Sequence, residues 1–127
     1  MKRDMDLVRN LLLQVEELNG PMMNDLMVDE KDADERARVG YHLRMLVDED
    51  FLNGDDGSGM MHEDWYNLQL AWQGHEFLDT LRDKTVWEKS KQIAGQASVG
   101  SAKALFDIGK AVVGAAITSA LKSHGIG

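Results

Sequence analysis

The segment WYNLQLAW, residues 65–72, most constrains the fold because it carries the period of a β-strand within a largely helical sequence. Tyr66, Leu68 and Leu70 fall on one side of such a strand, and the residues between them fall on the other. The preceding NGDDGSG, residues 53–59, has the glycine and aspartate content of a turn or hairpin loop. We therefore expect a mainly α fold with a small β-hairpin, which belongs to the α+β class.

Two helices are predicted before this hairpin. Asp4 can cap the first helix, and Asn19-Gly20-Pro21 ends it, because glycine favours a helix stop and proline cannot continue a helix. The apolar residues of this helix recur at helical spacing: Leu7, Leu11, Val15 and Leu18. Asp32 and Glu35 form a capping pair for the second helix, which ends before Phe51. Its apolar face holds the following residues: Val39, Leu43, Leu46 and Val47.

Three further helical segments follow the predicted hairpin. Gly74 opens the first of them, and a capping box over Thr85 to Glu88 restarts the helical pattern. The last helix begins at Ser98 or Ser101 and runs to about Lys122.

The order of these elements predicts the type of domain. Helix, helix, glycine-rich loop, strand and helix follow one another as they do in a winged helix. We expect a winged-helix-like domain over residues 1–90. A C-terminal helical extension over residues 91–127 follows it and serves packing or oligomerisation.

Composition indicates a globular protein without cysteine. The 127 residues are 43% hydrophobic and 28% charged, which suits one domain with a substantial core. Without cysteine the chain forms neither a disulfide framework nor a thiolate metal site. The first residues lack the apolar run of a signal peptide. We therefore expect a cytoplasmic protein.

Charge is distributed unevenly along the chain, whose net charge is −8. Residues 1–90 carry 10 basic and 21 acidic side chains, a net charge of −11, whereas residues 91–127 carry a net charge of +3. This is not the footprint of a protein that follows phosphates through clustered lysine and arginine. Four residues are predicted to form an acidic partner surface: Asp48, Asp50, Asp55 and Asp56. Such a surface would occupy a positively charged site on a host protein, as a nucleic-acid mimic does.

One face of the second predicted helix is the candidate for nucleic-acid contact. It holds Arg38, Tyr41 and Arg44, with Arg36 near its edge. In a winged helix this element is the recognition helix, and arginine suits guanine edges and phosphates. Acidic residues flank this face on both sides. Three interpretations therefore stay open: a solvated helix face with local ion pairs, contact with DNA, or contact with a protein partner.

Motifs for catalysis or metal binding are incomplete. His75-Glu76 resembles half of a zinc-hydrolase signature, but Asp79 stands where the second histidine is needed. GQASVGSA, residues 95–102, lacks the lysine of a phosphate-binding loop. DEDFLNGDDGSG, residues 48–59, lacks the ligands of a calcium loop. We therefore predict a non-enzymatic protein with no catalytic residue, no metal site and no cofactor.

The last predicted helix is long for a chain of this size. If it is continuous, its ~25 residues span about 38 Å, and its alanine and glycine stripe permits close approach of another helix. We expect it to pack back on the body or to form a homo-oligomer through residues 98–122. Its longest weakly polar run, Ala111 to Leu121, is about half of what a bilayer crossing needs. We therefore expect no membrane insertion.

Three segments resemble an uncharacterised bacterial and phage family, Domain of Unknown Function 2513: MKRDMDLVRNLLLQVEE, YHLRMLVDEDFL and LQLAWQGHEFLDTLRDKTVWEKSK. The likeness covers most of residues 1–91. The YHLRML segment, the hairpin and the GHEFL helix also resemble the winged-helix layout of small bacterial transcription regulators. The resemblance implies a winged-helix-like fold and occurrence in phages and mobile elements, and it assigns no catalytic residues. The family usually has threonine where Ala71 stands, and the tail after Gly95 is richer in alanine and glycine than expected.

Together these observations favour a non-enzymatic binding module of phage or mobile-element type. It would act through protein-protein contacts, and an inhibitor of a host protein is its most specific form. The alternative is a DNA-binding transcriptional regulator that uses the helix carrying Arg38, Tyr41 and Arg44.

Overall fold

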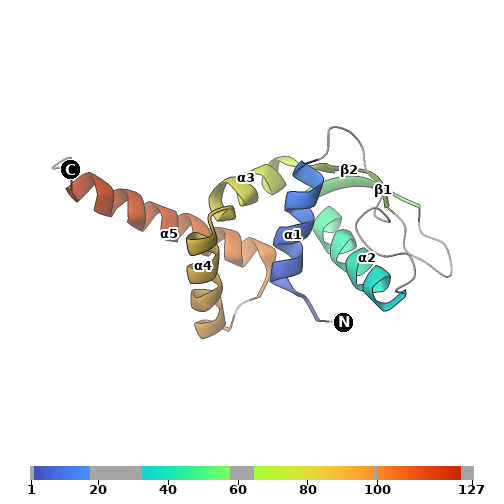
Figure 1. Ribbon diagram of the computed structural model, residues 1–127, viewed down its shortest axis with the longest axis horizontal. Coiled ribbons are helices and arrows are strands. Elements are labelled where there is room, and N and C mark those ends of the chain that lie inside the picture. Colours follow the sequence, from blue (N-terminus) through green and yellow to red (C-terminus); the bar gives the residue numbers. More distant parts are fainter. Residues whose placement is uncertain (1, 18–32, 58–64, 99, 124–127) are drawn as a thin grey trace. The chain divides into compact units, whose positions relative to one another are not determined.

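The computed structural model describes four stretches of the chain: residues 2–17, 33–57, 65–98 and 100–123. Within them the chain forms five helices and one two-stranded antiparallel sheet (Figure 1). Two compact units are distinguished, Met1–Leu78 and Asp79–Gly127, which are called unit 1 and unit 2 below.

The elements follow one another along the chain without a second sheet in the described stretches. Unit 1 begins with these elements, the last of which ends in unit 2: α1 (Met5–Glu16), α2 (Ala33–Asp48), β1 (Leu52–Asp56), β2 (Trp65–Leu70) and α3 (Trp72–Leu81). Unit 2 continues with α4 (Lys84–Gln96) and α5 (Ala102–Ser123).

The core of unit 1 forms where α1 and α2 pack against each other and against the hairpin. α1 contacts both α2 and β2, and α2 contacts β1. The buried apolar residues come from every element of the unit: Val8, Leu11, Leu12, Val15, Val39, Leu43, Leu46, Phe51, Leu52, Trp65, Leu68, Phe77 and Leu78. Burial of these side chains is the main force that holds the two helices on the small sheet.

α1 begins where the sequence predicts. The carboxylate of Asp4 accepts a hydrogen bond from the backbone N–H of Leu7 at 3.2 Å and caps the helix. Its predicted apolar face is confirmed in Leu11 and Val15, which are buried. The predicted helix stop at Asn19-Gly20-Pro21 lies outside the described residues.

α2 ends in a Schellman motif. The backbone N–H of Phe51 donates to the carbonyl of Leu46 at 2.8 Å, and that of Asp50 donates to the carbonyl of Val47 at 3.1 Å. Asp50 has a φ of 64°, in the left-handed region that glycine usually occupies at this position. The predicted end of the helix before Phe51 is confirmed, whereas its predicted cap, Asp32, lies outside the described residues.

The first strand of the hairpin lies where a loop was predicted. β1 includes residues 53–56, so their assignment to a turn was wrong. β1 and β2 pair in antiparallel fashion, with Leu52 opposite Leu70 and Asn53 opposite Gln69. These pairs satisfy the backbone groups of a glycine- and aspartate-rich segment, which composition alone does not reveal.

A β-bulge overturns the predicted alternation of β2. The pairing register shifts by one residue, so that Gly54 lies opposite both Asn67 and Leu68. Asn67 takes a φ of 56° at this point. Because the extra residue resets the alternation, Trp65 and Leu68 are both buried although they are three positions apart. Tyr66, which was predicted to share the side of Leu68, is only half-buried.

The turn from β2 into α3 closes against the backbone of Phe51. The N–H of Ala71 donates to the carbonyl oxygen of Phe51 at 3.1 Å. A Cβ at Gly74 would lie 2.2 Å from the same oxygen, so this close approach requires glycine. The rings of Phe51 and Phe77 meet edge to face with their centroids 5.6 Å apart. The predicted strand-to-helix turn is confirmed, although the helix begins at Trp72.

Two capping side chains begin the helices of unit 2, and these helices pack against each other. The carboxylate of Asp83 accepts from the N–H of Val86 at 3.0 Å, so α4 starts just before the predicted capping box at Thr85. The hydroxyl of Ser101 accepts from the N–H of Ala104 at 3.0 Å. This contact selects the second of the two predicted starts of the last helix.

The α+β class with a small hairpin is confirmed. The winged-helix arrangement stays a prediction, because residues 18–32 between α1 and α2 lie outside the described stretches. The division into residues 1–90 and 91–127 also stays a prediction, since compactness within a chain does not decide which part folds alone.

Replacing Gly74 by alanine is expected to lower the free energy of unfolding by about 1–3 kcal/mol, the usual cost of an extra methyl group in a packed site. The clash is with a backbone oxygen, which cannot swing aside as a flexible side chain can. Urea denaturation followed by circular dichroism measures the change. Gly95→Ala is the matched control, because no atom lies within 4 Å of a Cβ at that position. Equal stability of the two variants would contradict the role of Gly74.

Candidate functional site

The predicted basic face lies along α2, where its side chains meet acidic residues of other elements. The guanidinium of Arg38 forms a hydrogen-bonded ion pair with the carboxylate of Asp4, which precedes α1. Arg36 is half-buried on the same helix, and Tyr41 packs edge to face on the ring of His42 with the centroids 5.5 Å apart. The first part of this face is therefore attached to the start of α1.

Asp4 and His42 complete this attachment. The backbone N–H of Asp4 donates to Nε2 of His42 at 2.8 Å, and Nδ1 of His42 lies 2.7 Å from the carbonyl oxygen of Arg38. A backbone N–H can only donate, so Nε2 accepts and Nδ1 carries the proton that is donated to Arg38. The buried imidazole of His42 is thus neutral in this geometry, and it links the two helices through both ring nitrogens.

Arg44 occupies a separate cluster on the hairpin side of α2. Its guanidinium lies 3.3 Å from the carboxylate of Asp56 on β1. The same guanidinium stands over the ring of Trp65 on β2, 5.3 Å from its centroid. Because both side chains of the ion pair are partly exposed, it adds little to stability by itself, but it holds Arg44 against the sheet.

The structure therefore divides the candidate basic residues between two sets of partners. Arg38 pairs with Asp4 and Arg44 pairs with Asp56. A phosphate that approached this face would have to displace a carboxylate from each arginine. The geometry corresponds to the first of the three open interpretations, a helix face with local ion pairs, while DNA contact remains a prediction.

The predicted acidic residues lie at the end of α2 and along β1. Asp48 and Asp50 are exposed, and no lysine or arginine of the described stretches pairs with either. Asp55 accepts a hydrogen bond from the amide of Asn67 at 2.7 Å, and Asp56 pairs with Arg44. Two of the four carboxylates are thus committed to local contacts, and two face solvent.

His75 and Glu76 lie on the first turns of α3. His75 is exposed and Glu76 is half-exposed. Within the described residues there is no group of three or more histidine, cysteine, aspartate or glutamate side chains that could hold a metal ion. The backbone N–H of His75 donates to the carbonyl of Ala71 at 3.1 Å, so this residue takes part in the first turn of the helix.

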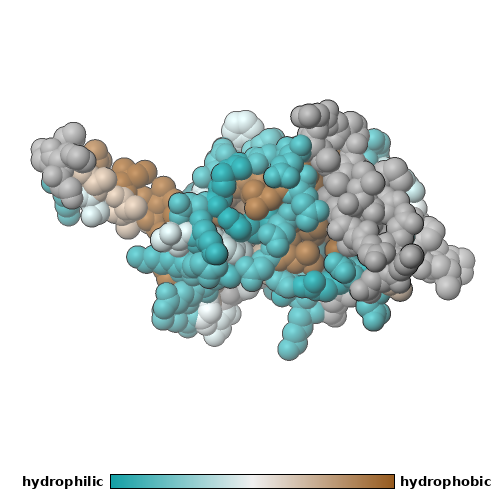
Figure 2. All heavy atoms as spheres, viewed as in Figure 1, coloured by the Kyte–Doolittle hydropathy of each residue, from teal (hydrophilic) through white to brown (hydrophobic). Residues whose placement is uncertain are grey.

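α5 presents an exposed apolar surface. Over Ala102–Lys122 it is long and apolar enough to cross a membrane by length and composition, with a mean hydropathy of 1.5. Only 11% of this segment is buried, and the large side chains of Ile117 and Leu121 are 54% and 44% exposed. Figure 2 shows hydrophobic surface along the exposed part of this helix. A patch of this kind is typical of an interaction surface.

Two features of the structure were not predicted from the sequence. His42 was placed near the edge of the basic face, yet it is a buried link between α1 and α2. Its position four residues after Arg38 was the available signal, because such spacing brings a ring nitrogen near a helix carbonyl. The second feature is a groove between α4 and α5, which depends on how two helices diverge and leaves no mark in the sequence.

The comparisons with known proteins agree with the sequence resemblance. A family model described as "Hypothetical protein (DUF2513)" matches residues 2–100. The chain belongs to this family. It is 33% identical over 91 residues to an uncharacterized protein of Haemophilus influenzae, a match that covers 72% of this chain and 76% of that protein. No solved structure matches the chain. Membership of the DUF2513 family is thus confirmed, and it brings no activity with it.

Substitutions at Asp4 should separate its two roles. Asp4→Ala removes the cap and the ion pair and is expected to lower the free energy of unfolding by about 0.5–2 kcal/mol. Asp4→Asn keeps a capping oxygen and loses only the charge, so its loss should be at most about 1 kcal/mol. Thermal denaturation of both variants measures the difference. Equal losses would mean that the cap contributes nothing beyond the ion pair.

Proposed function

We propose that this DUF2513 protein is a non-enzymatic binding module, of phage or mobile-element type, that acts through protein-protein contacts. Its proposed contact surface is the acidic edge of unit 1, defined by Asp48, Asp50, Asp55 and Asp56. The partner would be a host protein with a positively charged site, which the acidic edge would occupy in place of a nucleic acid.

The observation that carries this proposal is the unequal pairing of charges on unit 1. The arginines of the basic face engage the chain's own carboxylates, while Asp48 and Asp50 stay exposed at the end of α2 without a basic partner among the described residues. The surplus of eleven negative charges over residues 1–90 adds a long-range field of the same sign. Such a field speeds encounter with a positively charged protein and disfavours encounter with nucleic acid.

The local structure supports presentation of these carboxylates on a fixed frame. Asp50 belongs to the Schellman motif that ends α2, and Asp55 and Asp56 lie on the paired strand β1. Neither segment has to become ordered when a partner binds, so that part of the entropic cost of binding is avoided.

Neutralising the acidic edge should abolish binding to the partner. The variant that combines Asp48→Asn, Asp50→Asn, Asp55→Asn and Asp56→Asn removes four charges, and asparagine tolerates the left-handed backbone at position 50. We expect proteins that co-purify with the tagged wild-type chain from its native cell to be lost with this variant, as measured by quantitative mass spectrometry. Retention of every such protein at wild-type level would rule out the acidic edge as the contact surface.

A charge-matched control distinguishes this surface from net charge alone. It neutralises four carboxylates elsewhere on the chain: Glu17→Gln, Asp34→Asn, Glu76→Gln and Glu88→Gln. This variant has the same net charge as the first and should keep the partner. Loss of the partner from both variants would point to a nonspecific effect of charge.

The alternative, a DNA-binding regulator, makes the opposite prediction for α2. It requires Arg38, Tyr41 and Arg44 to contact duplex DNA with an affinity that falls steeply as salt rises. We expect no saturable binding when the DNA around the protein's own gene is titrated at low salt by fluorescence anisotropy. Binding that is lost in an Arg44→Met variant would favour the regulator over the protein-binding module.

A further inference from the structure

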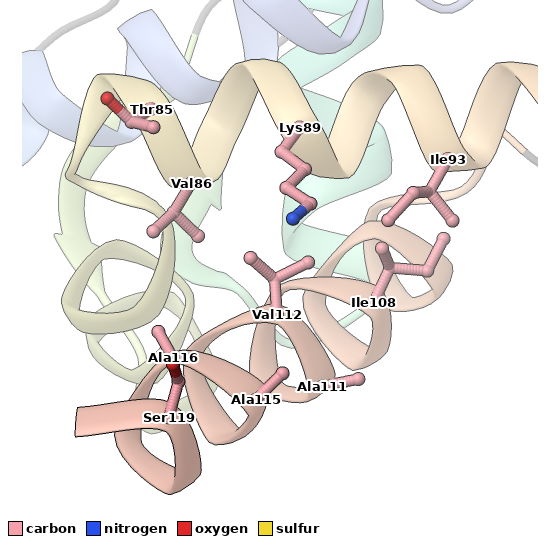
Figure 3. A pocket seen from close by; sticks show the side chains of 10 residues that line it. All are labelled: Thr85, Val86, Lys89, Ile93, Ile108, Ala111, Val112, Ala115, Ala116 and Ser119. Carbon is pink, nitrogen blue, oxygen red and sulfur yellow. The ribbon is translucent and has the colours of Figure 1, made fainter. Parts of the chain in front are cut away.

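The helices of unit 2 form an antiparallel pair with an apolar groove between them. In Figure 3 the side chains of Val86 and Ile93 on α4 point toward those of Ile108 and Val112 on α5. The groove has a volume of about 620 Å³. Its one charged side chain is Lys89, with which no carboxylate of the described residues pairs. A hollow lined in this way suits the apolar side of another helix.

A second apolar surface lies on the same helix, away from this groove. Val113, Ile117 and Leu121 are spaced four apart and form a ridge along one side of α5. Val113 is half-buried, whereas the other two are exposed. The charged residues of α5 precede or follow this ridge: Lys103, Asp107, Lys110 and Lys122. Unit 2 thus carries both an apolar ridge and an apolar groove.

We propose that the occupant of the groove is the ridge of a second copy of this chain, in a dimer with twofold symmetry. In such a dimer the same surfaces serve both chains, so each ridge enters the groove of the other chain. A ridge and a groove on one unit are the two halves that this symmetry requires. Unit 2 is then the dimerisation unit, which leaves the surfaces of unit 1 for another partner.

The size of the surface favours a reciprocal pairing over a single helix bound to the groove. The exposed part of α5 beyond Lys110 is about 18 Å long and about 10 Å wide, so one of its faces lies well below the ~800 Å² per partner of a stable interface. Reciprocal pairing buries two ridges and two grooves at once. It therefore comes closer to the area that a stable dimer needs.

The position of the lysines favours a protein over a bilayer as the occupant. Lys110 and Lys122 leave 11 uncharged residues between them, whereas a span of the ~30 Å hydrocarbon core needs about 20 apolar residues. Lys110 also lies 3.3 Å from the carboxylate of Asp107, so this turn of the helix holds an ion pair. The groove adds a concave shape that fits a helix.

Light scattering after size-exclusion chromatography tests the proposal on the full chain. The wild type should have the mass of two chains, and Ile117→Asn with Leu121→Asn should raise the dissociation constant about tenfold or more, because each exposed apolar side chain is buried only in the dimer. The control, Thr118→Asn with Lys122→Gln, changes the same turns outside the ridge and should stay dimeric. Circular dichroism checks that each variant is folded.

Disulfide cross-linking tests which surfaces meet. The chain has no cysteine, so single introduced cysteines report one position each. An Ile117→Cys chain mixed with a Val86→Cys chain should form a cross-linked heterodimer on oxidation. A Thr118→Cys chain mixed with the same Val86→Cys chain should form much less.

Four outcomes would overturn the proposal. They are a single-chain mass for the wild type, a dimer that the ridge variant leaves intact, equal cross-linking by the two mixtures, and ridge-dependent sedimentation of the wild-type chain with phosphatidylglycerol vesicles, which would make a bilayer the occupant. None of them bears on the acidic edge of unit 1, since its variants are tested on a different unit. Conversely, the four-asparagine variant of the acidic edge should remain a dimer.

Discussion

Unit 1 depends on Phe51, where a helix end, a strand pair and a second helix meet. Its backbone N–H closes the Schellman motif of α2, and its carbonyl oxygen accepts from Ala71 at the end of β2. Its ring packs on Phe77 of α3. The backbone groups fix the directions of the chain, and the buried ring contributes apolar area at the same point. The hairpin could not sit on α2 and lead into α3 without this residue.

The parts of this fold that could be predicted from sequence are those set by local chemistry. The caps at Asp4 and Ser101, the helix end before Phe51 and the strand-to-helix turn follow from which side chains satisfy or interrupt a helix within a few residues. The extent of β1 could not be predicted, because its pairing with β2 stabilises a sequence with low strand propensity. The bulge at Asn67 was hidden for the same reason, since a register shift depends on both strands.

For the candidate site, sequence located the residues but not their partners. Arg38 and Arg44 were correctly placed on one face of α2, yet their pairing with Asp4 and Asp56 joins positions that lie 34 and 12 residues apart. Such pairs are a property of the packed chain. They change the chemical meaning of the face, because a guanidinium that already holds a carboxylate has less to offer an incoming phosphate. The remaining exposed carboxylates then set the sign of the field that a partner meets.

The left-handed backbone at Asp50 has a consequence for how the chain can evolve. Glycine would occupy this position with less strain, so the folded protein carries a small loss of stability for as long as a side chain is present there. Relief of that strain and retention of the carboxylate exclude each other at this residue. Selection for a sturdier fold would drive position 50 toward glycine, and selection for a negatively charged tip would oppose it.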